Sequence, residues 1–206
     1  MFALIENGQF VKIVNSNKGI TIGDNQYPKS IYNLWSEDER NAIGIYEVSV
    51  DNTNKKDEAY YINTDISYSY ANGVVTASYG TATPKPLDDV LFTQADADAD
   101  EIPDDKSVGD VKQYGLKGQK ISIIKQQAGG LLAPTDWHVV KATEVADYSV
   151  PTDIATYRTN VRTKSNEMET QINACTTVDE LKALYEYTED AEGNITKPLA
   201  EFPEEL

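Results

Sequence analysis

The sequence has one cysteine, Cys175, and one histidine, His138, among its 206 residues. A single cysteine excludes a disulfide framework or a cysteine-based zinc site within one chain. No nucleophile or orienting carboxylate stands at a recognisable spacing from His138, and the chain has no glycine-rich phosphate loop. We therefore expect no enzymatic activity, no cofactor and no metal. His138 is interpreted as a surface or interface residue and Cys175 as a small core residue.

Long apolar runs are also missing, because none approaches the roughly 20 residues that a membrane-spanning helix needs. The first six residues lack a basic segment, so we expect no signal peptide and residence in a cytoplasm. Basic residues are few: 18 lysines and arginines face 34 acids, giving a formal net charge of −16. Such a balance repels phosphate backbones, so we expect neither nucleic acid nor membrane as a partner.

Two Asn-Gly pairs indicate β-hairpins in the N-terminal part of the chain. Asn7-Gly8 separates the apolar runs 2–5 and 10–14, and Asn72-Gly73 separates 60–70 from 74–83. Both residues of such a pair tolerate the positive φ that a tight hairpin turn requires. A capping box at Ser36 and Glu39 predicts a one-turn helix before a strand at 43–50. Residues 1–87 are therefore predicted to form an antiparallel β domain of a sandwich-like kind.

Tyrosine is concentrated in this β region, where six of the 13 tyrosines lie between Tyr46 and Tyr79. Tyrosine suits a binding face, but it is equally common on the half-buried side of an ordinary sheet, which is the interpretation we favour. Strand alternation places Tyr68 and Tyr70 on one face. The candidate partner-binding residues are Tyr60, Tyr61, Tyr68, Tyr70 and Tyr79.

Residues 88–107 carry eight acids and one base. The alternating carboxylates at Asp96, Asp98 and Asp100 are typical of the start of an EF-hand loop. That hypothesis fails because Glu101 stands where glycine is needed and Ser107 where a bidentate glutamate is needed. We predict a solvated acidic linker between the β and helical domains that is extended or poorly ordered, since like charges along it repel one another.

Residues 108–206 are predicted to form an α-helical domain. We expect one helix from Lys120 that ends at Gly129-Gly130, and a second from Asp136, where Thr135 caps it after Pro134. Pro151 lies in the first turn of a third helix. A capping box at Thr177 and Glu180 starts a fourth. A small terminal hairpin is expected from strands near 185–188 and 195–197, and Pro198 and Pro203 leave the last residues extended.

The third of these helices has an apolar seventh-residue repeat at Ile154, Val161, Met168 and Cys175. Such a repeat is typical of a helix beside partner helices, which could belong to the same chain or to other copies. The candidate oligomerisation residues are Ile154, Tyr157, Val161 and Met168. Arg158 and Arg162 share one face, which we interpret as a solvated face within the chain.

Several of these segments resemble a known family. The run Leu132-Ala133-Pro134-Thr135-Asp136-Trp137, Val150-Pro151, Tyr157-Arg158 and Val161-Arg162 resemble the C-terminal helical part of tailed-bacteriophage tail fibre assembly proteins. Residues 1–8 and 43–46 resemble the small β domain that often opens such phage tail proteins.

The resemblance implies a non-catalytic chaperone that acts in the host cell cytoplasm and is absent from the mature virion. Its β-rich domain would bind the distal part of a phage tail fibre protein. Its helical domain would form a homo-oligomer, with a trimer favoured by the family and by fibre symmetry. The alternative is a structural tail or baseplate component, or a fibre-borne adhesin, that is retained in the virion.

Overall fold

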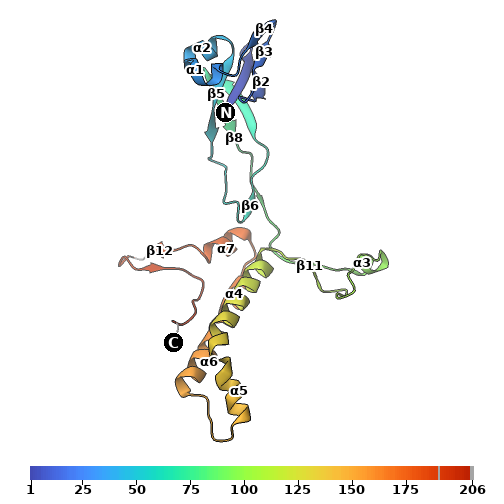
Figure 1. Ribbon diagram of the computed structural model, residues 1–206, viewed down its shortest axis with the longest axis vertical. Coiled ribbons are helices and arrows are strands. Elements are labelled where there is room, and N and C mark those ends of the chain that lie inside the picture. Colours follow the sequence, from blue (N-terminus) through green and yellow to red (C-terminus); the bar gives the residue numbers. More distant parts are fainter. Residues whose placement is uncertain (190, 205–206) are drawn as a thin grey trace. The chain divides into compact units, whose positions relative to one another are not determined.

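The computed structural model describes residues 1–189 and 191–204 (Figure 1). The chain divides into two compact units, Met1–Thr83 and Pro84–Leu206. A curled β-sheet dominates the first unit and helices dominate the second. The fold thus combines α and β structure, as predicted. Among the described residues, no helix is both long enough and apolar enough to cross a membrane.

The N-terminal unit is built on one five-stranded sheet with the strand order β2-β1-β5-β8-β7. Both predicted hairpins are confirmed: Asn7 and Gly8 have φ of 51° and 76°, and Asn72 and Gly73 have φ of 53° and 80°. The bounds of the sheet strands are β1 Phe2–Glu6, β2 Gln9–Val14, β5 Ile45–Asp51, β7 Ser67–Ala71 and β8 Val74–Ser78. Two-stranded ribbons are formed by β3 Ile20–Ile22 with β4 Asn25–Tyr27, and by β6 Tyr61–Ile62 with β9 Thr83–Pro84.

The prediction of an antiparallel domain is wrong at one pair of strands, and the described residues do not form the sandwich-like arrangement that we expected. Strands β5 and β8 run parallel, with Val48 opposite Val75, and the unit has one curled sheet. Val75 is fully buried and Ala77 nearly so, whereas β7 alternates tyrosine with exposed serine. The more apolar β8 therefore pairs with β5, and the more polar β7 lies at the edge of the sheet. In this position β8 runs in the same direction as β5.

Both faces of this sheet are covered by apolar side chains. One face packs Leu4 and Ile45 against Ile31 of α1 (Ile31–Leu34), a short helix that the sequence did not reveal. The capping box that begins α2 (Glu37–Ala42) is confirmed, because the Ser36 side chain accepts from the Glu39 backbone and the Glu39 carboxylate accepts in return. Hydrogen bonds from Ser36 hold the pKa of Glu39 below its ordinary value. The opposite face buries Ala3, Ile5, Val48, Val75 and Ala77.

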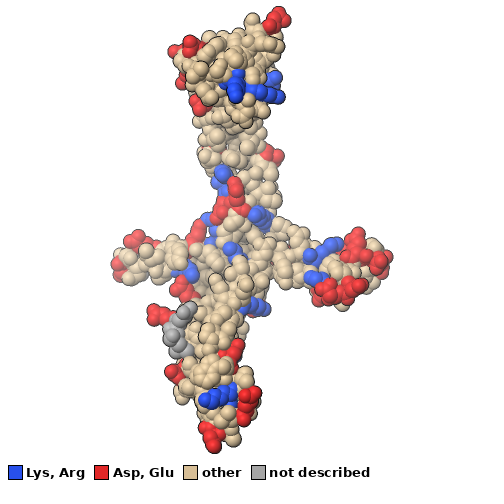
Figure 2. All heavy atoms as spheres, in the orientation of Figure 1, with Lys and Arg blue, Asp and Glu red and all other residues tan. Residues whose placement is uncertain are grey.

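The second unit opens with a short ribbon and helix, formed by β10 Val90–Leu91, α3 Gln94–Asp98 and β11 Val111–Gln113. We had predicted that the acidic segment would be extended, and this prediction is wrong for the part that forms the ribbon and α3. A capping box between Thr93 and Asp96 begins α3, and Lys112 of β11 pairs with Asp96. These contacts offset the repulsion that we expected to extend the segment. Figure 2 shows the acidic atoms gathered over α3, beside basic ones.

The helical part consists of α4 Leu116–Leu132, a 3₁₀ turn η1 Ala133–Thr135, α5 Asp136–Glu144, α6 Thr152–Ala174 and α7 Val178–Ala183. A terminal hairpin follows, in which β12 (Thr188–Glu189) pairs with β13 (Ile195–Thr196), as predicted. The capping box of Thr177 and Glu180 is also confirmed. Pro151 is the residue before the first turn of α6 and does not lie within it.

The predicted start of α4 is wrong. The helix begins at Leu116, four residues before the predicted Lys120, because its first N–H groups find acceptors outside the helix. Leu116 and Lys117 donate to the carbonyls of Pro86 and Leu87, and Gly115 donates to the Asp89 carboxylate. A Cβ at Gly115 would lie 2.3 Å from the Asp88 carbonyl oxygen, so glycine is needed for this close approach.

The predicted end of α4 is wrong as well. Gly129 and Gly130 lie inside the helix, where neither has a positive φ. The residue before a proline is usually kept out of helical geometry, and we had placed the start of the next helix after Pro134 for that reason. Ala133 is nevertheless helical, with φ −54° and ψ −43°. The 3₁₀ turn accommodates Pro134, and α4 therefore passes directly into α5.

The core of the helical part lies between α4 and α6. Ala128 of α4 packs with Tyr157 and Val161 of α6, and Leu131, Leu132 and Phe202 complete the cluster. Ile172 and Leu181 are fully buried further along. Helix α5, by contrast, has no buried residue.

Candidate functional site

The junction of α4, η1 and α6 contains a buried arginine. The Arg158 side chain is only 8% exposed, and its guanidinium Nη1 donates to the Leu132 carbonyl at 2.9 Å and to the Thr135 hydroxyl at 2.6 Å. Its Nη2 lies 2.8 Å from the carboxylate of Asp136. A guanidinium removed from water is tolerated where its donors are paired in this way. The prediction that Arg158 lies on a solvated face is therefore wrong.

This junction also explains why Thr135 does not cap α5. Its hydroxyl donates to the Leu132 carbonyl at 2.8 Å and accepts from Arg158, and it makes no capping hydrogen bond to α5. Carbonyls at the end of a helix lack partners within the helix, and side-chain donors can satisfy them. Thr135 and Arg158 serve that purpose for α4. The Thr135 side chain thus caps the C-terminal end of α4 and not the N-terminal end of α5.

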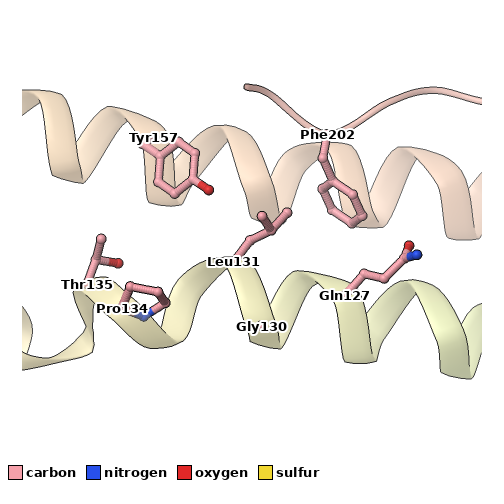
Figure 3. A pocket seen from close by; sticks show the side chains of 7 residues that line it. All are labelled: Gln127, Gly130, Leu131, Pro134, Thr135, Tyr157 and Phe202. Atoms are coloured by element: carbon pink, nitrogen blue, oxygen red, sulfur yellow. The ribbon is translucent and has the colours of Figure 1, made fainter. Parts of the chain in front are cut away.

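An open hollow of about 530 Å³ lies beside this junction. Figure 3 shows the side chains of Leu131 and Gln127 on α4, Tyr157 on α6, and Phe202 reaching in from the C-terminal segment. Gly130, Pro134 and Thr135 line the rest of it. Apolar walls with a few polar groups suit the binding of another molecule's apolar side chains.

The predicted oligomerisation residues face this core. Tyr157, Val161 and Met168 are buried within the unit, and only Ile154 is partly exposed. Val161 packs against Ala128 of α4. The intrachain packing that we held open as an alternative thus accounts for this seam within one chain. A role of the same residues between copies stays a prediction.

The five candidate tyrosines are divided between the core and half-exposed positions. Tyr60 and Tyr61 are buried. Tyr68 stacks on Phe10 of β2 with ring centroids 4.8 Å apart, and Tyr70 packs edge-on against Tyr46 at 4.9 Å. Both therefore lie on the same face of β7, as predicted.

The remaining tyrosine, Tyr79, is half-buried, and the Lys55 ammonium lies 5.6 Å from the centroid of its ring. A partner could reach Tyr68, Tyr70 and Tyr79, whereas Tyr60 and Tyr61 are structural in this conformation.

His138 and Cys175 differ in their surroundings. His138 stacks on Trp137 with ring centroids 3.6 Å apart and contacts the Tyr148 hydroxyl through Nδ1. Cys175 is buried, as predicted, and burial raises the pKa of its thiol. Within the described residues, no group of three or more histidine, cysteine, aspartate or glutamate side chains could hold a metal ion.

The residues that sequence analysis missed are on the C-terminal segment. Leu199 is buried and Phe202 packs on the core, although both lie in a stretch that was predicted only to be extended. Two apolar residues enclosed by Pro198 and Pro203 could have signalled such a docked segment.

No protein-family model, curated protein or solved structure with which the chain was compared matches it.

Proposed function

We propose that this chain is a non-catalytic assembly chaperone for a bacteriophage tail fibre protein. One observation carries the proposal. Two of the segments that resemble tail fibre assembly proteins, 132–137 and 157–162, meet in one hydrogen-bonded junction. Arg158 of the second segment bonds Leu132, Thr135 and Asp136 of the first. This supports the resemblance, because residues that make one structural unit are expected to be retained together.

The physical need for such a helper is clear. Fibre tips intertwine three chains, whose strand edges and apolar surfaces stay exposed until all three meet. In this proposal the β unit binds the distal part of the fibre through Tyr68, Tyr70 and Tyr79, the candidate tyrosines that remain half-exposed. The helical unit gathers several copies, three by fibre symmetry, which raises the local concentration of fibre chains. The chaperone acts in the host cell cytoplasm and leaves before the virion is mature.

Co-expression with a tail fibre gene of the same phage tests this function. We expect the distal fibre fragment to be soluble and trimeric when this chain is present, and insoluble when it is absent. A variant with Tyr68→Ser and Tyr79→Ser should lose this effect while its circular dichroism is unchanged. Thr143→Ser, a mild change on exposed α5, is the matched control.

Two results would contradict the proposal. The first is a fibre that trimerises equally well without the chain. The second is recovery of the chain from purified virions in stoichiometric amounts, measured by mass spectrometry, which would instead favour a structural tail component or a fibre-borne adhesin.

A further inference from the structure

The C-terminal segment lies in the helical unit as a docked, extended peptide. Leu199 is only 4% exposed, and Phe202 packs on the cluster formed by Ala128, Tyr157 and Val161. Figure 3 shows Phe202 pointing from this segment toward Leu131 and Gln127 of α4. The segment therefore inserts two apolar side chains, three positions apart, into the helical core.

A glutamine of α6 holds the backbone of this segment. Gln171 Nε2 donates to the Pro198 carbonyl at 2.9 Å, and Gln171 Oε1 accepts from the Ala200 N–H at 2.9 Å. Between them, the Leu199 N–H donates to the Leu184 carbonyl at 3.0 Å. Backbone hydrogen bonds of this kind bind an extended chain whatever its sequence, and the pockets for its side chains select the sequence. The groove thus has both elements of a peptide-binding site.

The segment does not fill the groove. The hollow of about 530 Å³ continues from Phe202 to Thr135, and a second of about 400 Å³ is lined by Ile123, Met168, Leu199 and Phe202, among others. Space thus remains for the side chains of a peptide that binds more completely.

The connection to the helices is exposed. Tyr187 is 67% exposed and Ile195 is 71% exposed, and the two strands of the hairpin pair with each other. The docked segment can therefore leave the groove without breaking the pairing of the hairpin. Prolines at 198 and 203 restrict the backbone of the segment, which reduces the entropy lost when it docks.

We propose that the groove between α4 and α6 is a peptide-binding site, which residues 198–203 occupy as a tethered ligand. Its partner is an extended segment of another protein that carries two apolar side chains three positions apart, and this segment displaces residues 198–203. The inference goes beyond the proposed function, because the groove has this chemistry whether or not the partner is a fibre.

Displacement can be measured with the full-length chain. The probe is a fluorescein-labelled synthetic peptide with the sequence of residues 196–204, and binding is followed by fluorescence anisotropy. In a chain with Leu199→Ser and Phe202→Ser the tethered segment is weakened. We expect this variant to bind the probe at least about tenfold more tightly than the wild type, because an occupied groove reduces the apparent affinity by the fraction that is free.

Two controls test the groove itself. Gln171→Ala, added to the weakened chain, should reduce affinity for the probe by about tenfold, since it removes both side-chain hydrogen bonds to the bound backbone. A probe peptide with serine in place of its leucine and phenylalanine should not bind. Should the double variant lose its helical circular dichroism, Phe202→Ala alone replaces it in the same assay.

Three outcomes would overturn the proposal. Equal affinity of the wild type and the weakened chain would show that the segment does not block the groove. Absence of binding to a folded, weakened chain would show that the groove binds no free peptide. Concentration-dependent dimers of the wild type that the weakened chain does not form would assign the groove to a second copy instead. None of these results depends on whether fibre trimerisation requires this chain.

Discussion

The guanidinium of Arg158 and the hydroxyl of Thr135 lie 2.6 Å apart, although the two residues are 23 positions apart in the sequence. The same guanidinium bonds the Leu132 carbonyl, so a single side chain of α6 fixes the turn where α4 ends and α5 begins. The geometry of η1, whose residues Pro134 and Thr135 line the hollow, therefore depends on Arg158.

Replacing this arginine should destabilise the helical unit. Arg158→Met keeps most of the apolar stem but leaves the part-buried Leu132 carbonyl and the buried Thr135 hydroxyl each with one hydrogen-bond donor fewer. We expect a loss of about 2 kcal/mol in the free energy of unfolding, measured by urea denaturation with circular dichroism. The exposed Asp136 carboxylate adds little to this loss. Arg162→Met, the same change at an exposed position four residues on, should cost under about 0.5 kcal/mol. Equal losses in the two variants would argue against a special role for Arg158.

A substitution at Val161 distinguishes packing within one chain from association between copies. It is fully buried against α4, so Val161→Ala should lower the free energy of unfolding by about 2 kcal/mol. Val140→Ala, the same change at a residue that is 53% exposed on α5, should have little effect. A Val161→Ala variant with unchanged stability but a smaller sedimentation coefficient would place this residue between copies, as the heptad repeat also allows.

The ribbon of β10 and β11 together with helix α3 should become less stable in acid. The Lys112 ammonium has the largest effect on the pKa of Asp96, and hydrogen bonds from Thr93 add to it. Together they hold this pKa well below its ordinary value. The carboxylate therefore contributes stability above the unfolded pKa of about 4, and this contribution is lost as the pH falls through the folded pKa.

Amide exchange at Thr93, followed by nuclear magnetic resonance, should consequently accelerate below about pH 4 beyond its intrinsic pH dependence. Asp96→Asn should abolish this response, whereas Asp98→Asn should retain it. A response that persists in Asp96→Asn would assign the transition to another group.

Glycine at position 129 weakens α4. A Cβ there meets nothing within 4 Å and the backbone is helical, so Gly129→Ala should stabilise the unit by about 0.5–1 kcal/mol. Gly73→Ala also meets no atoms, yet its φ of +80° should make the change destabilising. Thermal unfolding can be followed by circular dichroism, in the far ultraviolet for α4 and in the near ultraviolet for the tyrosines of the sheet. The midpoint temperature should rise in Gly129→Ala and fall in Gly73→Ala.

Local signals in the sequence located many of the elements. The Asn-Gly turns at 7–8 and 72–73 and the capping boxes at Ser36 and Thr177 involve residues at most four apart, so their chemistry is complete in a short stretch of chain. The same reasoning misplaced the end of α4, because Gly129-Gly130 ends a helix only where the chain turns away. Here packing of Ala128 and Leu131 on α6 keeps the helix intact.

By itself, the sequence determined which segments form hairpins and where the capping boxes at Ser36 and Thr177 begin helices, since those choices depend on φ preferences and on nearest hydrogen-bond partners. Tertiary structure alone decided that β8 lies parallel to β5, that Arg158 is buried at a helix junction, and that Leu199 and Phe202 dock on α6. Each of these depends on groups far apart in the chain, whose meeting is set by the burial of apolar surface and the pairing of buried polar atoms, which no local pattern records.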